Sequence, residues 1–319
     1  MESIYFRKRW QRATVNTLFG VAFVLLPLLL IACGGSTTGG STSSSTPTSN
    51  ALPCPATNSG NAPTPTPYPT TTSLTAPTDL ITAGTLTVGS DTTYPPQEFI
   101  DTTTGNAVGF DVDLITAMAQ KLGLKAKVVT ANFNTILDDL SAKRYDVVIS
   151  AITINSDRVQ KADFVPYFQA GESLIVQKGN PMGLKCVQNL CGLKAGVQSG
   201  TVELDDLNAA SKACTAAGKP AIQLTVLKDQ TAVIQLLVNH RVDATYQDSP
   251  VTDYYIKQNP GQFEIGGTVV NAAPEGIAIR KNDTPMLTAM RAAFSAIKSD
   301  GTYDSLFTKW QLNSAQKIG

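Results

Sequence analysis

The chain has 319 residues, and its 25 basic side chains balance its 25 acidic ones. This neutral balance excludes the strongly basic surface of a typical nucleic-acid-binding protein, so no nucleic-acid partner is expected. The only histidine, His240, follows a predicted helix, which excludes a histidine-based catalytic triad and a multi-histidine metal site. A P-loop motif is also absent from the sequence, and we expect neither a cofactor nor a metal.

The first 32 residues are predicted to be a lipoprotein signal peptide. Basic residues precede an apolar run from Leu18 to Ile31, whose 14 residues are fewer than the roughly 20 of a membrane-spanning helix. Leu30-Ile31-Ala32 then precedes Cys33 in the manner of a lipobox. Cys33 is therefore expected to become the lipidated first residue of the mature chain. The alternative is an uncleaved membrane anchor, which would leave the protein on the same side of the membrane.

Residues 33–78 are predicted to form a lipidated, disordered tether. Ser, Thr, Gly and Pro dominate this stretch, and no apolar periodicity is present. The remaining residues, about 240 of them from Asp79 onward, are enough for two lobes of about 100 residues each.

From Leu86 onward, predicted strands and helices alternate. The first series is a strand near 86–89, a helix over 112–122 capped by Asp111, a strand over 126–129, a helix over 134–143 and a strand over 146–150. The second series is a strand over 194–197, a helix over 202–216, a strand over 221–226, a helix over 231–239 and a strand over 243–246, with further helices between 285 and 310. This alternation predicts an α/β fold with two lobes, each a mainly parallel sheet flanked by helices.

Polar side chains lie just after several of the predicted strands. Ligands in such sheets bind at the carboxyl ends of the strands. Arg158, in the first turn of a helix, can hold a carboxylate with two parallel hydrogen bonds, and Asp248 can accept from an ammonium. With Tyr94 for packing, the parts of an α-amino-acid site are present. The alternatives are a surface arginine at position 158 and a simple helix N-cap at position 248.

Six segments, in this order, resemble one known family, the extracytoplasmic solute-binding proteins of polar amino-acid ABC importers, called family 3. The resemblance covers roughly Asp79 to Asn313. Its most specific segments are Asp91-Thr92-Thr93-Tyr94-Pro95-Pro96, Val108-Gly109-Phe110-Asp111-Val112-Asp113-Leu114, Ile152-Thr153-Ile154 with Arg158, Val197-Gln198-Ser199-Gly200-Thr201, Gln247-Asp248 and Asp300-Gly301-Thr302-Tyr303. It implies the two-lobed, type II periplasmic-binding-protein-like fold, with lobe one at 79–171 and 272–319 and lobe two at 172–271.

The resemblance also implies a ligand site. Arg158 would bind the α-carboxylate with Thr153 and with backbone N–H groups at the start of a helix, and Asp248 would bind the α-ammonium. Tyr94 and Phe133 would pack against the ligand side chain, with Asp91 at its polar end. The expected ligand-binding residues are Asp91, Tyr94, Phe133, Ser150, Ala151, Thr153, Arg158, Gln198, Thr201, Val202 and Asp248. The alternative for Tyr94 and Phe133 is an ordinary place in the core.

Four positions bear on specificity or depart from the family pattern. Gln97 stands where the family usually has phenylalanine, and Ala151 stands where serine or glycine is common. Asp91 and Glu98 favour a basic or amide side chain in the ligand, although we expect Glu98 to be solvated or structural.

Four cysteines remain after Cys33, and four cysteines allow three pairings. We predict a disulfide between Cys191, which precedes a strand, and Cys214, near the end of the following helix. Cys186 with Cys191 is the competing pair, and Cys54 has no predicted partner.

The function that the resemblance implies is capture of a polar amino acid between two closing lobes. The protein would be an exported, lipid-anchored monomer on the outer face of the cell membrane or in the periplasm. It would deliver its ligand to an ABC-importer permease with its ATPase, and it would not be an enzyme. The alternatives are a sensory module of the same fold and a cyclohexadienyl-dehydratase-like enzyme with Glu98 or Asp91 as an acid.

Overall fold

The computed structural model describes residues 50–55 and 74–318. The predicted signal peptide, the lipidated Cys33 and most of the predicted tether lie outside these residues. Among the described helices, none is long and apolar enough to cross a membrane.

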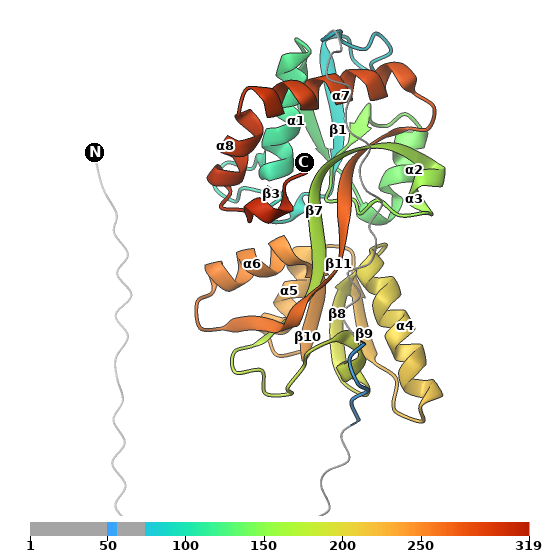
Figure 1. Cartoon of the computed structure of the whole chain (residues 1–319), viewed down its shortest axis with the longest axis vertical. Coiled ribbons are helices and arrows are strands. Elements are labelled where there is room, and N and C mark those ends of the chain that lie inside the picture. The colour runs from blue at the N-terminus through green and yellow to red at the C-terminus, as the bar shows by residue number, and fades with distance from the viewer. Residues whose placement is uncertain (1–49, 56–73, 319) are drawn as a thin grey trace, which may run out of the picture. The chain divides into compact units, whose positions relative to one another are not determined.

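Lobe one contains three parallel strands beside each other in the sheet (Figure 1). They are β5 (Lys125–Thr130), β1 (Thr85–Ser90) and β6 (Val147–Val148), in that order. The flanking helices are α1 (Phe110–Lys121), α2 (Ile136–Ser141), α3 (Arg158–Lys161), α7 (Thr284–Ser299) and α8 (Thr302–Lys309). The helices α1, α7 and α8 bury their apolar faces in one core with β1, which gives this lobe most of its buried aromatic side chains.

Lobe two repeats this arrangement with its own core (Figure 1). Its parallel strands are β10 (Ala244–Asp248), β8 (Lys194–Gln198) and β9 (Gln223–Leu227). Its helices are α4 (Val202–Ala216), α5 (Gln230–Val238) and α6 (Ser249–Gln258).

Two long strands connect the lobes. They are β7 (Ala162–Gln177) and β11 (Phe263–Arg280), which pair antiparallel along most of their length (Figure 1). Because both strands run through both lobes, one sheet has the order β5-β1-β6-β11-β7-β10-β8-β9. The ladder between them is irregular from Gly266 to Ala273. The predicted two-lobed α/β fold is confirmed, although the sequence did not predict that both connections are long strands.

Shorter elements complete both lobes. A small antiparallel sheet contains β2 (Thr93–Tyr94), β3 (Glu98–Ile100) and β4 (Ala107–Val108). Short 3₁₀ turns lie at Phe133–Thr135, Val187–Leu190 and Ser314–Gln316.

Helix α1 begins two residues before the predicted start. Its N-cap is Gly109 at a φ of 136°, where a Cβ atom would collide with the carbonyl oxygen of Gln97. The prediction that Asp111 caps this helix is therefore wrong, because Asp111 lies inside the helix and its side chain is buried.

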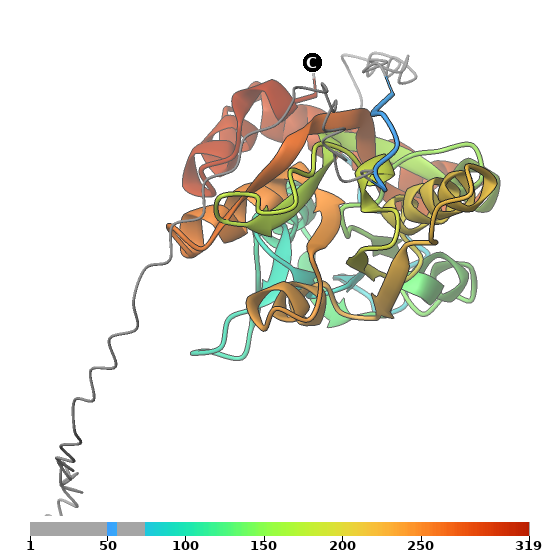
Figure 2. The same cartoon turned by 90° about the horizontal axis from the view of Figure 1, so that it is seen from below.

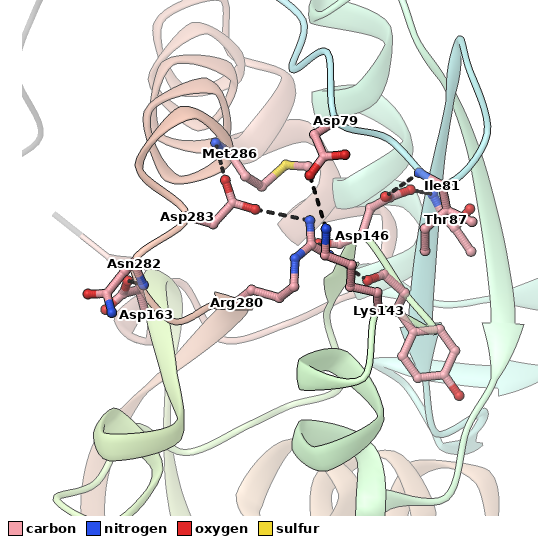
Figure 3. A network of polar contacts seen from close by, with 11 residues as sticks. Asp79, Ile81, Thr87, Lys143, Asp146, Asp163, Arg280, Asn282, Asp283 and Met286 are labelled. Atoms are coloured by element: carbon pink, nitrogen blue, oxygen red, sulfur yellow. Dashed lines mark hydrogen bonds and ion pairs between the residues drawn. The ribbon is translucent and has the colours of Figure 1, made fainter.

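The amino-terminal end of lobe one is held by a buried carboxylate (Figure 3). Asp146 lies just before β6, and its side chain accepts hydrogen bonds from the N–H groups of Ile81, at 2.9 Å, and Thr87, at 2.7 Å. The Thr87 N–H, which would otherwise be buried without a partner, is thus satisfied. This fixes the start of β1 against β6.

Arg280, at the end of β11, extends the same network (Figure 3). Its guanidinium donates to the Tyr145 carbonyl at 2.9 Å and pairs with Asp283 at 3.0 Å. Asp283 in turn accepts from the Met286 N–H at 3.2 Å and so caps α7. These contacts therefore join the start of β6, the end of β11 and the start of α7.

Two disulfides lie on lobe two. The predicted bond between Cys191 and Cys214 is present, with 5.5 Å between the Cα atoms. A second bond joins Cys54 to Cys186, with 5.7 Å between the Cα atoms, so the competing pair of Cys186 with Cys191 is wrong.

Residues 50–55, within the predicted tether, lie against lobe two (Figures 1 and 2). The Leu52 side chain packs on the core of this lobe. The Leu52 N–H donates to the Gln188 carbonyl at 3.1 Å, and Asn189 Nδ2 donates to the Leu52 carbonyl at 2.8 Å. The second disulfide therefore belongs to a segment that packs on lobe two, and Cys54, which had no predicted partner, is paired with Cys186.

Candidate functional site

The strand ends of the two lobes face each other around one cavity. The residues that line it are Asp91, Tyr94, Glu98, Phe133, Ser150, Ala151, Thr153, Arg158, Gln198, Thr201, Val202, Glu203 and Asp248. All eleven residues predicted for the ligand site are in this set. They converge because β1 ends before Asp91, β8 ends at Gln198 and β10 ends at Asp248.

Hydrogen bonds across the cavity join the two lobes directly. Gln198 Nε2 donates to Asp91 Oδ2 at 2.5 Å, and the Tyr94 hydroxyl donates to Asp248 Oδ2 at 2.8 Å. The Arg158 guanidinium also reaches the Gly200 carbonyl, at 3.2 Å. The structure is therefore the closed arrangement of the two lobes.

Arg158 is oriented by contacts on several sides. Its guanidinium donates to the Thr153 carbonyl at 2.8 Å and lies over the Phe133 ring, 5.4 Å from the ring centre. The Arg158 N–H donates to Asn155 Oδ1, so the first turn is capped by Asn155, while the Asp157 side chain makes no capping bond. A guanidinium held in this way presents a planar donor to a carboxylate. Burial lowers the pKa of Arg158.

Asp248 directly precedes α6, but its side chain makes no capping bond to the helix. It accepts from Tyr94 instead, so the helix-cap alternative for this side chain is wrong. Burial raises the pKa of Asp248 to about 7, against the opposing effects of the Tyr94 hydroxyl and the Arg158 charge. A cation in the cavity would stabilise the ionised carboxylate and lower this pKa.

Asp91 is held at the other end of the cavity. It accepts hydrogen bonds from the Thr93 hydroxyl at 2.9 Å and from Gln198, and burial raises its pKa to about 6. Asp91 is thus a buried, partly satisfied carboxylate that a ligand cation would stabilise in its charged form.

Gln97, where the family usually has phenylalanine, has a partner far along the chain. It is fully buried, and its Nε2 donates to Glu275 Oε2 at 2.5 Å. Glu275 lies on β11 and forms an isolated bridge with Thr153. The Gln97 amide is therefore hydrogen-bonded to a carboxyl group, that of Glu275, whose backbone pairs with Thr153 of the cavity lining.

Glu98 and Glu203 also line the cavity, although neither was among the expected ligand-binding residues. Glu98 has no exposed surface, so the expectation that it is solvated is wrong, and Glu203 is 2% exposed. Burial raises the pKa of Glu203 well above its usual value, and the nearby charge of Asp248 acts in the same direction. Glu203 lies in the first turn of α4, where an acidic side chain is common because it interacts favourably with the helix dipole. Its position next to the expected site residue Val202 was therefore the only sign in the sequence that it lines the site.

The cavity has an excess of acidic groups. Four carboxyl groups, those of Asp91, Glu98, Glu203 and Asp248, line it with a single guanidinium, that of Arg158. Within the part of the chain that the structure describes, no group of three or more His, Cys, Asp or Glu side chains is arranged to hold a metal ion. The arrangement suits an organic cation that also carries one carboxylate.

Several known proteins resemble most of this chain. The arginine-binding protein ArgT of Corynebacterium glutamicum is 31% identical over 237 residues, which cover 73% of this chain and 76% of that protein. The L-cystine-binding protein TcyJ of Escherichia coli K12 is 31% identical over 228 residues, which cover 71% of this chain and 82% of that protein.

A solved structure gives the same result. An ancestral arginine-binding protein bound to arginine is 37% identical, with a TM-score of 0.66, and the match covers 71% of this chain and 98% of that one. Residues 86–313 also match a family described as bacterial extracellular solute-binding proteins, family 3. The chain belongs to this family.

Proposed function

We propose that this protein binds a polar amino acid with a cationic side chain between its two lobes and delivers it to an ABC importer. The observation that carries the proposal is the composition of the cavity: Arg158 approaches from lobe one, Asp248 approaches from lobe two, and Asp91 remains for a second cation. Family membership supports the amino-acid part of the proposal, and the acidic excess supports the cationic part.

The α-carboxylate of the ligand would bind to Arg158. The backbone N–H groups at Thr201 and Val202, where α4 begins, would add a second set of donors, because the first N–H groups of a helix have no partner inside it. Thr153 would complete this end of the site from lobe one.

The α-ammonium would bind to Asp248, which comes from lobe two. An α-amino acid would therefore connect the lobes through its two charged groups. A ligand stabilises closure only through contacts that it makes in the closed form, and this arrangement provides them.

The ligand side chain would extend toward Asp91. Tyr94 and Phe133 would cover its apolar part, and Asp91 would neutralise a terminal guanidinium or ammonium. Gln198 would then exchange its bond to Asp91 for one to the ligand, or share that carboxylate with it.

Transport requires that the protein lie outside the cell membrane. We propose that residues 1–32 direct export and that Cys33 carries the lipid, with the protein acting as a monomer at the outer membrane face or in the periplasm. We also propose that the lobes divide at 171/172 and 271/272, within the two long strands. A permease with its ATPase would accept the closed form.

A thermal-shift screen of the mature chain against the common amino acids, ornithine, citrulline and cystine tests the proposal. A ligand at 100 times its dissociation constant stabilises a protein by about 2.7 kcal/mol, which raises the melting temperature measurably. We expect arginine, lysine or ornithine to give the largest shift, confirmed by calorimetry. A folded protein that responds to none of these compounds would contradict the proposal, and a response to cystine alone would contradict its cationic part.

A further inference from the structure

A chain of hydrogen bonds leads from the cavity to a buried pair of carboxyl groups. The Asp91 N–H donates to Ser150 Oγ at 2.9 Å, and the Ser150 hydroxyl donates to Glu98 Oε1 at 2.9 Å. The Glu98 carboxyl lies close enough to the carboxyl of Asp111 for the charge of Asp111 to raise the pKa of Glu98. Glu98 and Asp111 both have no exposed surface.

Two donors fix the far side of Asp111. The Tyr167 hydroxyl donates to Asp111 Oδ2 at 2.5 Å, and the Ala151 N–H donates to the same oxygen at 3.1 Å. Ala151 adopts a φ of 46°, in the left-handed region that is unfavourable for a non-glycine residue. The bond to Asp111 therefore helps to hold the backbone that lines the cavity in this conformation.

The two remaining oxygens of the pair have no donor among the described residues. These atoms are Glu98 Oε2 and Asp111 Oδ1, both completely buried. Ionised carboxylates only accept hydrogen bonds, so two adjacent anions would leave both oxygens unsatisfied and would repel each other. A single proton between them satisfies both oxygens.

The position of this proton follows from the donors. Asp111 receives two hydrogen bonds, whereas Glu98 receives one from Ser150, and donors stabilise the charged form of a carboxylate. Burial raises the pKa of Asp111 to about 6, and the bonds from Tyr167 and Ala151 oppose a larger rise. Burial and the charge of Asp111 raise the pKa of Glu98 well above its usual value, and Asp91 acts in the same direction.

We propose that Glu98 is a neutral positioning residue of the amino-acid site, which carries the proton of the pair and is not a charged contact for the ligand. The inference rests on the proposed function. Glu98 holds Ser150 in place and, through Asp111, it holds Ala151. The negative charge that faces the ligand side chain then comes from Asp91.

Two substitutions separate this role from a charged one. In Glu98→Gln, the amide oxygen can accept from Ser150 and the amide NH₂ can donate to Asp111, so the variant reproduces protonated glutamic acid. In Glu98→Ala, both bonds are lost. With arginine as the probe in calorimetry, we expect Glu98→Ala to raise Kd at least tenfold and Glu98→Gln to restore it to within threefold of the parent. An equal loss in both variants would overturn the proposal, because it would show that the charge at position 98 is needed.

Infrared spectroscopy locates the proton without a ligand. The parent, labelled with ¹³C-glutamate, should show at neutral pH a band of a buried neutral carboxylic acid that Glu98→Gln removes. The difference between parent and variant isolates Glu98 from Glu203 and Glu275, whose pKa values burial also raises. Absence of this difference band would overturn the proposal even if Glu98→Ala failed to fold. The band is read without ligand, so a failure of the protein to bind arginine would count against the proposed function alone.

Discussion

Replacing Arg158 by alanine should abolish most of the affinity for the amino acid. Arg158 carries the only guanidinium among the described residues that line the cavity, and its contacts with Thr153 and Gly200 orient it toward the space between the lobes. A hydrogen bond to a charged group contributes about 1.5–3 kcal/mol, and a carboxylate left buried without its partner adds a further penalty. Two such bonds give an expected loss of at least about 3 kcal/mol, or more than a hundredfold in Kd.

Calorimetry with the best ligand from the screen measures this loss directly. Arg158→Lys is the matched control, because it keeps the positive charge but loses the planar pair of donors, and it should bind between the parent and the alanine variant. The melting temperature of each ligand-free variant separates lost binding from lost folding. If Arg158→Ala bound the amino acid as tightly as the parent, the assignment of this residue to the α-carboxylate would be refuted.

Three further predictions concern the carboxyl groups around the cavity. Asp91→Asn should weaken binding of arginine at least tenfold in calorimetry and change binding of glutamine much less, because only the cationic side chain needs the charge; equal losses would contradict this role. Because burial raises the pKa of Asp91 to about 6 and that of Asp248 to about 7, affinity for a cationic amino acid should fall as pH is lowered from 8 to 5, by up to about tenfold per unit for each proton that the ligand must displace. An affinity independent of pH would argue against both groups as ligand contacts. The free energy of unfolding of the ligand-free protein should instead rise as pH is lowered over this range, since groups with raised pKa values in the folded state lose their stabilising contribution as pH rises through those values. Gln97→Leu should lower the free energy of unfolding, measured in urea, by about 2–3 kcal/mol, because Glu275 loses its buried donor. The double variant Gln97→Leu/Glu275→Leu should recover part of this loss. A Gln97→Leu variant as stable as the parent would show that the pair contributes nothing to stability.

The sequence predicted the parts of the fold that depend on local patterns. The helix predicted over 202–216 has those bounds in the structure, because Thr201 caps it and its apolar positions repeat with helical spacing. The cavity residues at strand ends were predicted for a related reason, since each follows an apolar strand whose end can be recognised in the sequence.

The remaining features depend on partners far along the chain. Strand β7 is buried almost continuously, so it lacks the alternation that marks a half-buried strand, and its full length is set by pairing with β11. Glu98 is buried beside Ser150 and Asp111, which come from other segments, and its own neighbourhood in the sequence gives no sign of them. Cys54 and Cys186 are 132 positions apart, and no local pattern joins them.

The Cys54–Cys186 bond attaches the amino-terminal segment covalently to lobe two. For the lipid proposed at Cys33, only 21 positions separate the anchor from Cys54 on lobe two, whereas 43 separate it from Ala76, which packs on the core of lobe one. At about 3.4 Å per extended residue, the largest distance that the chain can span is about 70 Å from Cys33 to Cys54 and about 145 Å from Cys33 to Ala76. In an oxidising exterior, the first covalent attachment of this segment to the folded part would therefore be on lobe two, with the shorter of the two limits on its distance from the membrane.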